Sequence, residues 1–384
     1  MADSRIVYVN NHLLEDPRIW SFLHDQLHYP WQQYVKITTK WNGANDGAYI
    51  RKGKNTWPFQ LLDASLPLTP IPVLCKDFDQ TFSDITDLRL LDLKSKFWDR
   101  RWMVQYSGGI DSTLIMCAIL RNLDIKDLDN ITVCCNRVSV YENPEFFYRY
   151  VKPNFCLQDS SGKYDVSDLC EHSLVLDGEP SYVWPPLGVL GAWRCNPQRL
   201  DQSLDQPGDL IDLVTQRVDR SFAEWLYESM MINIRSQELT IKNYWQFFWW
   251  LTFNVCCSHQ FHPLADMMAP SKLAIDRYFK FSHHWYDWAP YQQWSMQQDF
   301  AKEMFRTSQC MDKFAAKMYI RDFTRDDTYF RYKGKCTSSA ARRNSGHGSW
   351  FCILDDRTPL SLDRHLDQIK QLLPGHLNPE LRVG

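Results

Sequence analysis

One part of the sequence alternates between two spacings of hydrophobic residues. Residues 83–98 (SDITDLRLLDLKSKFW) begin with a Ser/Asp cap and repeat their leucines at roughly helical intervals, and residues 113–123 (TLIMCAILRNL) are apolar on nearly every helical face. Residues 102–106 (WMVQY) and 130–141 (NITVCCNRVSVY) are instead rich in β-branched and aromatic residues, which is typical of strands. Residues 143–151 follow, with asparagine as N-cap and proline at the first helical position. The pattern predicts helix, strand, buried helix, strand and helix.

This alternation of strands and helices is typical of a parallel, doubly wound α/β sheet. In such sheets ligands bind at the carboxyl ends of the strands. Residues 172–188 (HSLVLDGEPSYVWPPLG) supply a further apolar strand that ends in a turn. From residue 210 to about residue 332 the pattern is mostly helical and rich in aromatic residues. Within it, residues 244–257 (YWQFFWWLTFNVCC) fall short of the roughly 20 residues of a membrane span, so we expect a buried helix.

The chain divides into three predicted parts. Residues 1–85 carry strand-like runs and a proline-marked extended stretch, which indicate a small N-terminal α+β unit. Residues 86–340 hold the alternating pattern and form the predicted main domain, which becomes helical towards its end. Residues 341–384 combine a flexible polar loop with a C-terminal helix.

Composition favours a soluble globular protein. The 384 residues are 44% hydrophobic and 23% charged, and the 16 tryptophans are better explained by aromatic cores than by a stacking surface. The net charge of −3 gives no general reason to expect a nucleic-acid partner. None of the twelve cysteines falls in a CxxC pair, which argues against a zinc ribbon or a redox dithiol. We therefore expect free thiols in a cytoplasmic protein without a membrane partner.

A polar loop, SGGIDS, occupies residues 107–112, between the strand and the buried helix. Gly108 and Gly109 permit positive φ and let a ligand approach the backbone. A tight strand-to-helix turn leaves unpaired N–H groups at the helix start, where the helix dipole also favours an anion. Hydroxyl donors come from three residues: Ser107, Ser112 and Thr113. The loop therefore predicts a phosphate cradle, with Asp111 placed to hold Mg²⁺ against the phosphate.

The same residues have a plainer interpretation. SGGIDS is also compatible with an ordinary glycine turn before a buried helix, and an aspartate in a first helical turn usually serves only as a dipole partner. The strand and helix on either side favour phosphate binding, and metal binding at Asp111 depends on that hypothesis.

The SGGIDS segment resembles the PP-loop of the ATP pyrophosphatase superfamily, whose pattern is SGGxDS. It differs from the GxxxxGK[ST] P-loop because no lysine follows the glycines. Members of the superfamily cleave ATP between the α and β phosphates and hold the departing pyrophosphate in this loop. The AMP moiety activates a carboxylate or a carbonyl-like oxygen. The resemblance implies a doubly wound, adenine nucleotide alpha hydrolase-like sheet, with ATP and Mg²⁺ bound at residues 107–113.

A longer stretch is similar to the synthetase domain of asparagine synthetases. In that family a helix with an arginine followed by leucines leads into the loop, as residues 89–91 do here. Residues 261–275 (FHPLADMMAPSKLAI) are similar to the family's Pro-hydrophobic-x-Asp stretch. Residues 317–335 (KMYIRDFTRDDTYFRYKGK) are similar to its Lys-x-x-hydrophobic-Arg segment followed by Arg-x-Lys.

The resemblance implies roles for several charged residues. Lys333 takes the place of the lysine that stabilises charge beside the acyl-adenylate, and Arg331 precedes it in the motif. Asp177 and Glu179, in the segment LDGEPSY, match the family's second acidic motif loosely. They become a candidate metal ligand and a candidate catalytic residue, although a turn at a strand end also explains them. Lys333 and Arg331 stand in a charged run, and most such runs are solvated surface.

The implied activity is an AMP-forming carbon–nitrogen ligase. The enzyme would adenylate a small-molecule carboxylate or an amide oxygen, release pyrophosphate and transfer the activated group to ammonia or an amine. The family's glutaminase domain needs a cysteine directly after the initiator methionine, and this sequence begins Met1–Ala2–Asp3, so we expect the nitrogen from solution or from a separate glutaminase subunit. Two alternatives remain open: a PP-loop enzyme that modifies a tRNA or DNA base, and a non-catalytic ATP-binding scaffold.

Overall fold

The protein is described from a computed structural model. The structure describes residues 7–9, 75, 77–160, 170, 172–178, 201–205, 208–215, 220–236, 241–255, 280–297, 313–333, 350–353 and 358–361. These residues fall into two compact units. The first, called the sheet unit below, takes its residues from 75–184 and 273–346. The second takes its residues from 1–74, 185–272 and 347–384.

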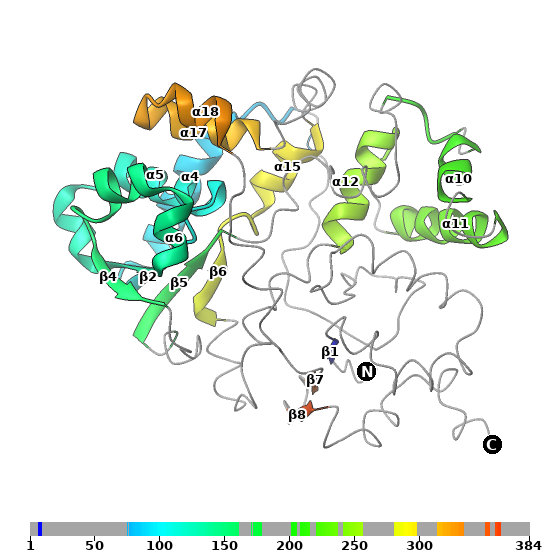
Figure 1. Ribbon diagram of the computed structural model, residues 1–384. Helices are drawn as coiled ribbons and strands as arrows, with labels where there is room; N and C mark the ends of the chain where they lie inside the picture. Colours follow the sequence, from blue (N-terminus) through cyan, green and yellow to red (C-terminus); the bar gives the residue numbers. More distant parts are fainter. Residues whose placement is uncertain are drawn as a thin grey trace. The chain divides into compact units, whose positions relative to one another are not determined.

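The sheet unit contains a five-stranded sheet in which every pair of neighbouring strands is parallel (Figure 1). The strands lie in the order β4-β3-β2-β5-β6. Their bounds are β2 Arg101–Gln105, β3 Ile131–Cys135, β4 Cys156–Asp159, β5 Ser173–Asp177 and β6 Ser282–His284. With helices between the strands, this arrangement confirms the predicted α/β fold with a parallel sheet.

Helices of the sheet unit pack against one another as well as against the strands. Helix α5 (Ile110–Asn122) contacts both α4 (Phe82–Phe97) and α17 (Phe314–Thr324), and α4 also contacts α15 (Ala289–Gln297). Six residues of α5, from Leu114 to Ile119, are fully buried, which confirms the predicted buried helix. An apolar helix of this kind is stable only when every face has a packing partner, and α4 and α17 supply two of them.

The hairpin of α17 and α18 (Asp327–Tyr332) is closed by a residue in the left-handed conformation. Arg325 follows α17 with φ of 60° and donates its N–H to the carbonyl of Arg321, which satisfies one of the free carbonyls at the end of α17. Asp326 then caps α18 by accepting a hydrogen bond from the N–H of Tyr329. Figure 1 shows the two helices as the orange pair above α4 and α5.

The N-cap of helix α4 lies two residues before the cap that the sequence pattern predicts at residue 83. Thr81 is the N-cap and forms a capping box with Asp84, each side chain accepting a hydrogen bond from the other residue's N–H. Arg89 of α4 is almost completely buried and donates to the carbonyl oxygens of Trp285, at 3.1 Å, and His284, at 3.3 Å. The arginine that precedes the loop in the sequence therefore ties α4 to the end of β6.

The predicted strand 130–141 is wrong beyond Cys135. The side chain of Asn136 accepts a hydrogen bond from the N–H of Ser139 and starts α6 (Arg137–Glu142). Asn143 then caps α7 (Pro144–Phe146), as the Asn-Pro pair predicts, and η2 (Phe147–Val151) continues it as a π-helix. The valines and tyrosine after Asn136 are typical of a strand. The segment is nevertheless helical, because Asn136 caps it and Ser139 and Glu142 of α6 are buried. Two short elements, η1 (Ile125–Asn130) and β4, complete this part of the unit.

The second unit is described by its helices and a small sheet. Helix α10 (Gly208–Thr215) packs against α11 (Arg220–Ser236), and α12 (Tyr244–Val255) buries five of its aromatic side chains completely or nearly so. The buried helix predicted near residues 244–257 is thereby confirmed for α12. The sheet is antiparallel in the order β1-β7-β8, with β1 Val7–Val9, β7 Trp350–Ile353 and β8 Thr358–Ser361.

Several expectations are untested. The domain limits near residues 85 and 340 stay predictions, and the predicted C-terminal helix lies outside the described residues. In the parts of the chain that the structure describes, no helix combines the length and apolar character needed to cross a bilayer.

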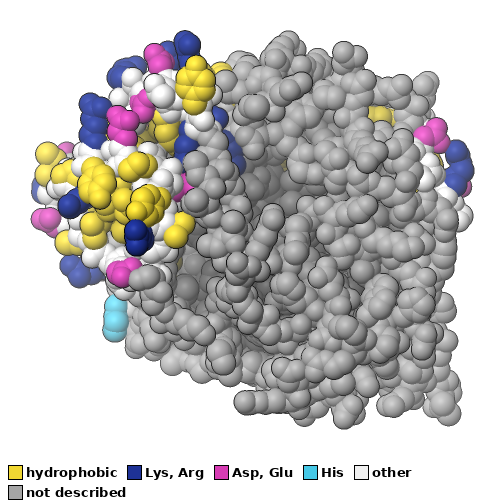
Figure 2. Space-filling model, in the orientation of Figure 1, with side chains coloured by type: hydrophobic (Ala, Val, Ile, Leu, Met, Phe, Trp, Pro, Cys, Tyr) yellow, Lys and Arg dark blue, Asp and Glu magenta, His cyan; other side chains and the backbone are white. Residues whose placement is uncertain are grey.

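Charge is mixed over the visible surface of the sheet unit. Figure 2 shows lysine and arginine side chains interspersed with aspartate and glutamate, around a patch of hydrophobic side chains. Two of the exposed tyrosines carry a cation against the ring: Arg137 lies 5.4 Å from the ring centre of Tyr141, and Lys152 lies 5.4 Å from that of Tyr148.

The environment of His283 predicts a pH-dependent stability. Burial of this ring, which packs 4.7 Å from the ring of Phe97, and the positive charge of Arg89 together lower the pKa of His283 to about 4. The unfolded chain takes up the proton near pH 6.5 and the folded protein only near pH 4, so the free energy of unfolding falls as the pH drops through this window.

We expect His283→Gln to reduce that loss by about 1–2 kcal/mol at pH 5, measured by urea denaturation at pH 7 and pH 5. His172→Gln, at an exposed position of the same unit, is the control. An unchanged difference between the two pH values in His283→Gln would show that this side chain does not carry the effect.

Candidate functional site

The candidate site lies where the order of the strands reverses. From β2 the chain moves through β3 to β4 at one edge of the sheet, whereas β5 and β6 lie on the other side of β2. Ligands of open parallel sheets bind outside the carboxyl ends of the strands at such a switch point. Residues 107–112 follow β2, and Gly178 follows β5, so the predicted phosphate loop and the end of β5 flank this position.

Gly108 brings the loop into contact with α6. Its φ of 73° is the only positive value at a described glycine. A Cβ atom at this position would lie 2.2 Å from the carbonyl oxygen of Ser139 and 2.8 Å from the Cβ of Glu142. Both the backbone conformation and the close approach therefore require glycine here.

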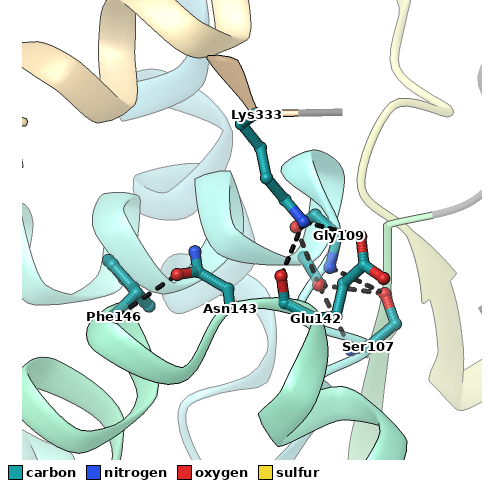
Figure 3. Close-up of polar contacts among 7 residues, drawn as sticks. Ser107, Gly109, Glu142, Asn143, Phe146 and Lys333 are labelled. Carbon is teal, nitrogen blue, oxygen red and sulfur yellow. Dashed lines mark hydrogen bonds and ion pairs between the residues drawn. The ribbon is translucent and has the colours of Figure 1, made fainter. Parts of the chain in front are cut away.

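Two serines hold the loop in its shape, and Figure 3 shows the contact of one of them, Ser107, with Gly109. The hydroxyl of Ser112 accepts a hydrogen bond from the N–H of Ser107 at 3.2 Å and donates to the carbonyl of Gly109. The hydroxyl of Ser107 lies 3.2 Å from that of Ser112 and accepts a hydrogen bond from the N–H of Gly109. These contacts close a compact turn directly before the first turn of α5.

The start of α5 is the part of the loop best suited to an anion. Gly109 is the N-cap and has no side chain to satisfy the N–H groups of the first helical turn. Gly178 lies against the same turn: a Cβ atom there would come within 3.0 Å of the Cβ of Asp111 and 3.1 Å of the nitrogen of Ser112. The end of β5 and the start of α5 therefore approach each other closely at Gly178, where a side chain would require the neighbouring atoms to shift slightly.

Lys333 reaches the loop region through a buried ion pair. Its ammonium lies 2.6 Å from Oε1 of Glu142 and donates a second hydrogen bond, at 2.7 Å, to the carbonyl oxygen of Glu142 (Figure 3). The side chains are 8% and 1% exposed, so both charges are largely removed from water and each compensates the other. Because Glu142 also touches Gly108, the structure brings Lys333 and the glycine loop together around one acidic residue.

A second lysine lies at the other carboxylate of the site. Lys313, directly before α17, donates a hydrogen bond to Oδ2 of Asp111 in the first turn of α5. Nearby, burial raises the pKa of Tyr286, and the negative charge of Asp111 contributes to the rise. The carboxylate predicted to hold Mg²⁺ thus has an ammonium partner.

The arrangement fits a phosphate-bearing ligand and a metal held partly by that ligand. The backbone N–H groups at the start of α5 have no capping side chain, and they lie at the switch point of the sheet. The close contacts of Gly108 and Gly178 occur at the same place. Within the described ranges, no group of three or more His, Cys, Asp or Glu side chains could enclose a metal ion. Mg²⁺ is commonly bound through one or two carboxylates together with substrate phosphates, which is the role that Asp111 could fill.

Thr113 points its hydroxyl into the core. Its Oγ1 is buried, as are the phenol oxygens of Tyr106 and Tyr329, and none of the three has a hydrogen-bond partner of good geometry. Burial raises the pKa of Tyr106 and that of Tyr329, and the neighbouring hydroxyl of Thr113 partly opposes both shifts. The backbone of Thr113 belongs to the first part of α5, whereas its hydroxyl is buried with the phenol oxygens of the two tyrosines.

The remaining candidates lie in different settings. Arg331 is exposed on α18, and Asp177 ends β5, where it pairs with His284 in the sheet register. Of the two cations in the Lys-x-x-hydrophobic-Arg segment, Lys317 is 3% exposed on α17 and Arg321 forms an ion pair with Asp327 at 2.5 Å. Glu179 and the stretch 261–275 lie outside the described residues.

Sequence reasoning missed two residues of the site, Glu142 and Lys313, and included Gly178 only as part of the LDGEPSY segment. Gly178 follows a predicted strand, so its close approach to a neighbouring loop was a possible inference. Glu142 and Lys313 gave no such signal, because each acquires its role through a partner about 200 residues away in the sequence.

We expect Gly108→Ala to destabilise the fold by at least about 2 kcal/mol, because it combines a left-handed backbone with a backbone clash. The matched variant is Gly109→Ala, whose added Cβ would meet only the Ser107 hydroxyl at 3.3 Å and whose φ is negative. Chemical denaturation compares the two. Equal stability of both variants would contradict the proposed contact between Gly108 and α6.

We expect Lys333→Met to cost about 3–5 kcal/mol, because it removes the ammonium that pairs with the buried carboxylate of Glu142. Adding Glu142→Gln to this variant removes the buried negative charge and recovers part of the loss. A double-mutant cycle by chemical denaturation measures the coupling. Strictly additive effects would show that the two side chains do not interact in the folded protein.

Comparison with known proteins gives no relative on which a function could be based. Searches of protein-family models, of curated proteins and of solved structures find no match to the chain. The fold and the site therefore rest on the described residues, and the resemblance of residues 107–112 to the PP-loop remains a hypothesis about their chemistry.

Proposed function

We propose that the protein is an ATP-dependent, AMP-forming ligase that resembles the synthetase domain of asparagine synthetases. The observation that carries the proposal is the position of the SGGIDS loop. It stands at the switch point of a parallel sheet, and Gly108 and Gly178 each bring a neighbouring backbone into contact with its turn. The finer fold that we propose is the doubly wound, adenine nucleotide alpha hydrolase-like sheet, which the strand order supports.

The loop would hold the pyrophosphate end of ATP. The N–H groups at the start of α5 face no capping side chain, and the helix dipole favours negative charge at this end. Ser107 and Ser112 fix the turn by their mutual contacts, so the backbone donors are in place before a ligand arrives. Such preorganisation lowers the cost of binding a charged group.

Charge at the reacting centre would be balanced by lysine and by metal. Mg²⁺, held by Asp111 and supported by Asp177 as in the family's two acidic motifs, would neutralise the phosphate oxygens and polarise the α-phosphate for attack. Lys333, held next to the loop by Glu142, would stabilise the charge that develops on the substrate oxygen and the leaving group. Arg331 and Glu179 are proposed to act in the same region, which the family's motifs support.

The substrate oxygen is proposed to belong to a carboxylate or an amide, which attacks the α-phosphorus while the bond to pyrophosphate breaks. Ammonia or an amine then attacks the activated carbon and AMP leaves. The nitrogen is proposed to come from solution or from a separate glutaminase subunit. The cytoplasm is the proposed location of the reaction.

The test is the fate of the phosphates. We expect incubation with ATP, Mg²⁺, ammonium and a panel of small carboxylic acids to give AMP and pyrophosphate in equal amounts, measured by ion-exchange chromatography. Asp111→Asn should reduce the rate at least 100-fold, because the metal loses a ligand whose charge has no substitute in the loop.

The matched control is Asp124→Asn, at a highly exposed carboxylate of the same unit, which should leave the rate unchanged. Formation of ADP and phosphate would refute the proposed cleavage. Full activity of a folded Asp111→Asn variant would refute the role of this carboxylate.

A further inference from the structure

The contact between Lys313 and Asp111 joins two elements that are distant in the sequence. Asp111 lies in the first turn of α5 and Lys313 directly precedes α17, and these helices pack against each other. Both side chains are 19% exposed. An ion pair that is four-fifths buried and held at both ends by packed helices is better defined than a surface pair between two mobile side chains.

The pair creates a competition at one carboxylate. Mg²⁺ binds proteins through carboxylate oxygens, and the ammonium of Lys313 donates to Oδ2 of Asp111. A metal ion arriving alone would have to break the ion pair between this ammonium and Asp111, and the loss of a partly buried ion pair is unfavourable.

A triphosphate removes that penalty. Its oxygens are strong acceptors for an ammonium, and they would bind at the start of α5, whose first turn contains Asp111. Lys313 could then exchange the carboxylate for a phosphate oxygen while the metal takes the carboxylate. In this exchange Lys313 keeps an anionic partner and Asp111 keeps a cationic one. The metal would then link Asp111 to the phosphates.

The other lysine of the site is less suited to such an exchange. Lys333 donates to both the side chain and the main-chain carbonyl of Glu142, and that carboxylate is 1% exposed. Glu142 is also in contact with Gly108, so its position is set by the loop backbone. The two lysines therefore differ: Lys333 is anchored, whereas Lys313 shares its partner with the candidate metal.

We propose that Lys313 couples metal binding to nucleotide binding, by occupying Asp111 when the site is empty and moving to the phosphates when the nucleotide arrives. The inference rests on the proposed function, because it needs a triphosphate at the loop. It assigns Lys313 as a further ligand-positioning residue, and it makes the metal a weak ligand on its own and a strong one together with the nucleotide. This coupling acts in both directions, as linkage requires.

The experiment measures binding without turnover. Mn²⁺ is the metal probe, followed by electron paramagnetic resonance, and α,β-methylene-ATP is the nucleotide probe, followed by calorimetry in the presence of Mn²⁺. We expect Lys313→Met to bind Mn²⁺ alone at least 10-fold more tightly than the unmodified protein, because the carboxylate is no longer occupied. The same variant should bind the nucleotide with Mn²⁺ at least 10-fold more weakly, because a phosphate contact is lost.

Two further variants serve as controls. Lys313→Arg keeps the positive charge and should retain most of the coupling. Lys96→Met removes a charge from an exposed ion pair with Asp92 on α4 and should change neither affinity. Thermal denaturation verifies that each variant is folded.

The outcomes separate this inference from the proposed function. If the unmodified protein binds the nucleotide and Lys313→Met shows the same two affinities, the coupling is refuted while the proposed function stands. If the unmodified protein binds the nucleotide equally well without a divalent ion, Lys313 replaces the metal, and the exchange is again refuted. If no nucleotide binds to the unmodified protein with Mn²⁺, both proposals fail.

Discussion

The architecture depends on how closely other backbones approach the first turn of α5. Gly108 lies against the main chain of α6 on one side, and Gly178 lies against Asp111 and Ser112 on the other. In each case the missing Cβ is what permits the contact. Three segments that follow or connect the strands are thereby drawn to one point, and the polar N–H groups of a helix start are presented there. A side chain at Gly108 would clash with the main chain of α6, and a side chain at Gly178 would crowd the first turn of α5.

Burial gives the charges at this point their significance. An isolated ionised group away from water is costly, and both acids next to the loop, Asp111 and Glu142, are paired with a lysine. Within each of these two ion pairs the charges balance. An incoming polyanion would therefore bring its own cations or draw a lysine away from its acid. In the proposed chemistry, charged groups that are already paired in the fold exchange partners when the ligand binds.

Local patterns were sufficient for the elements but not for the contacts between them. The strand at 102–106 and the buried helix after it could be predicted because their composition and periodicity are local properties, and the parallel sheet followed from their alternation. The prediction was wrong after Cys135. There Asn136 caps a helix whose β-branched residues had indicated a strand. The partners of Asp111 and Glu142 could not be predicted, because they come from segments 202 and 191 residues away. Such pairings are decided by tertiary packing.

The left-handed Arg325 has a consequence for both lysines. Lys313 stands at the beginning of α17 and Lys333 at the end of α18, so one helical hairpin, folded over at this residue, carries both ammonium groups to the loop. Their separation is fixed by the number of residues in the two helices. An insertion or deletion within the hairpin would rotate one ammonium away from its acid by about 100° per residue while leaving the other in place. The length of the hairpin therefore sets the positions of the two ammonium groups, and the proposed chemistry depends on that length as well as on the two lysines.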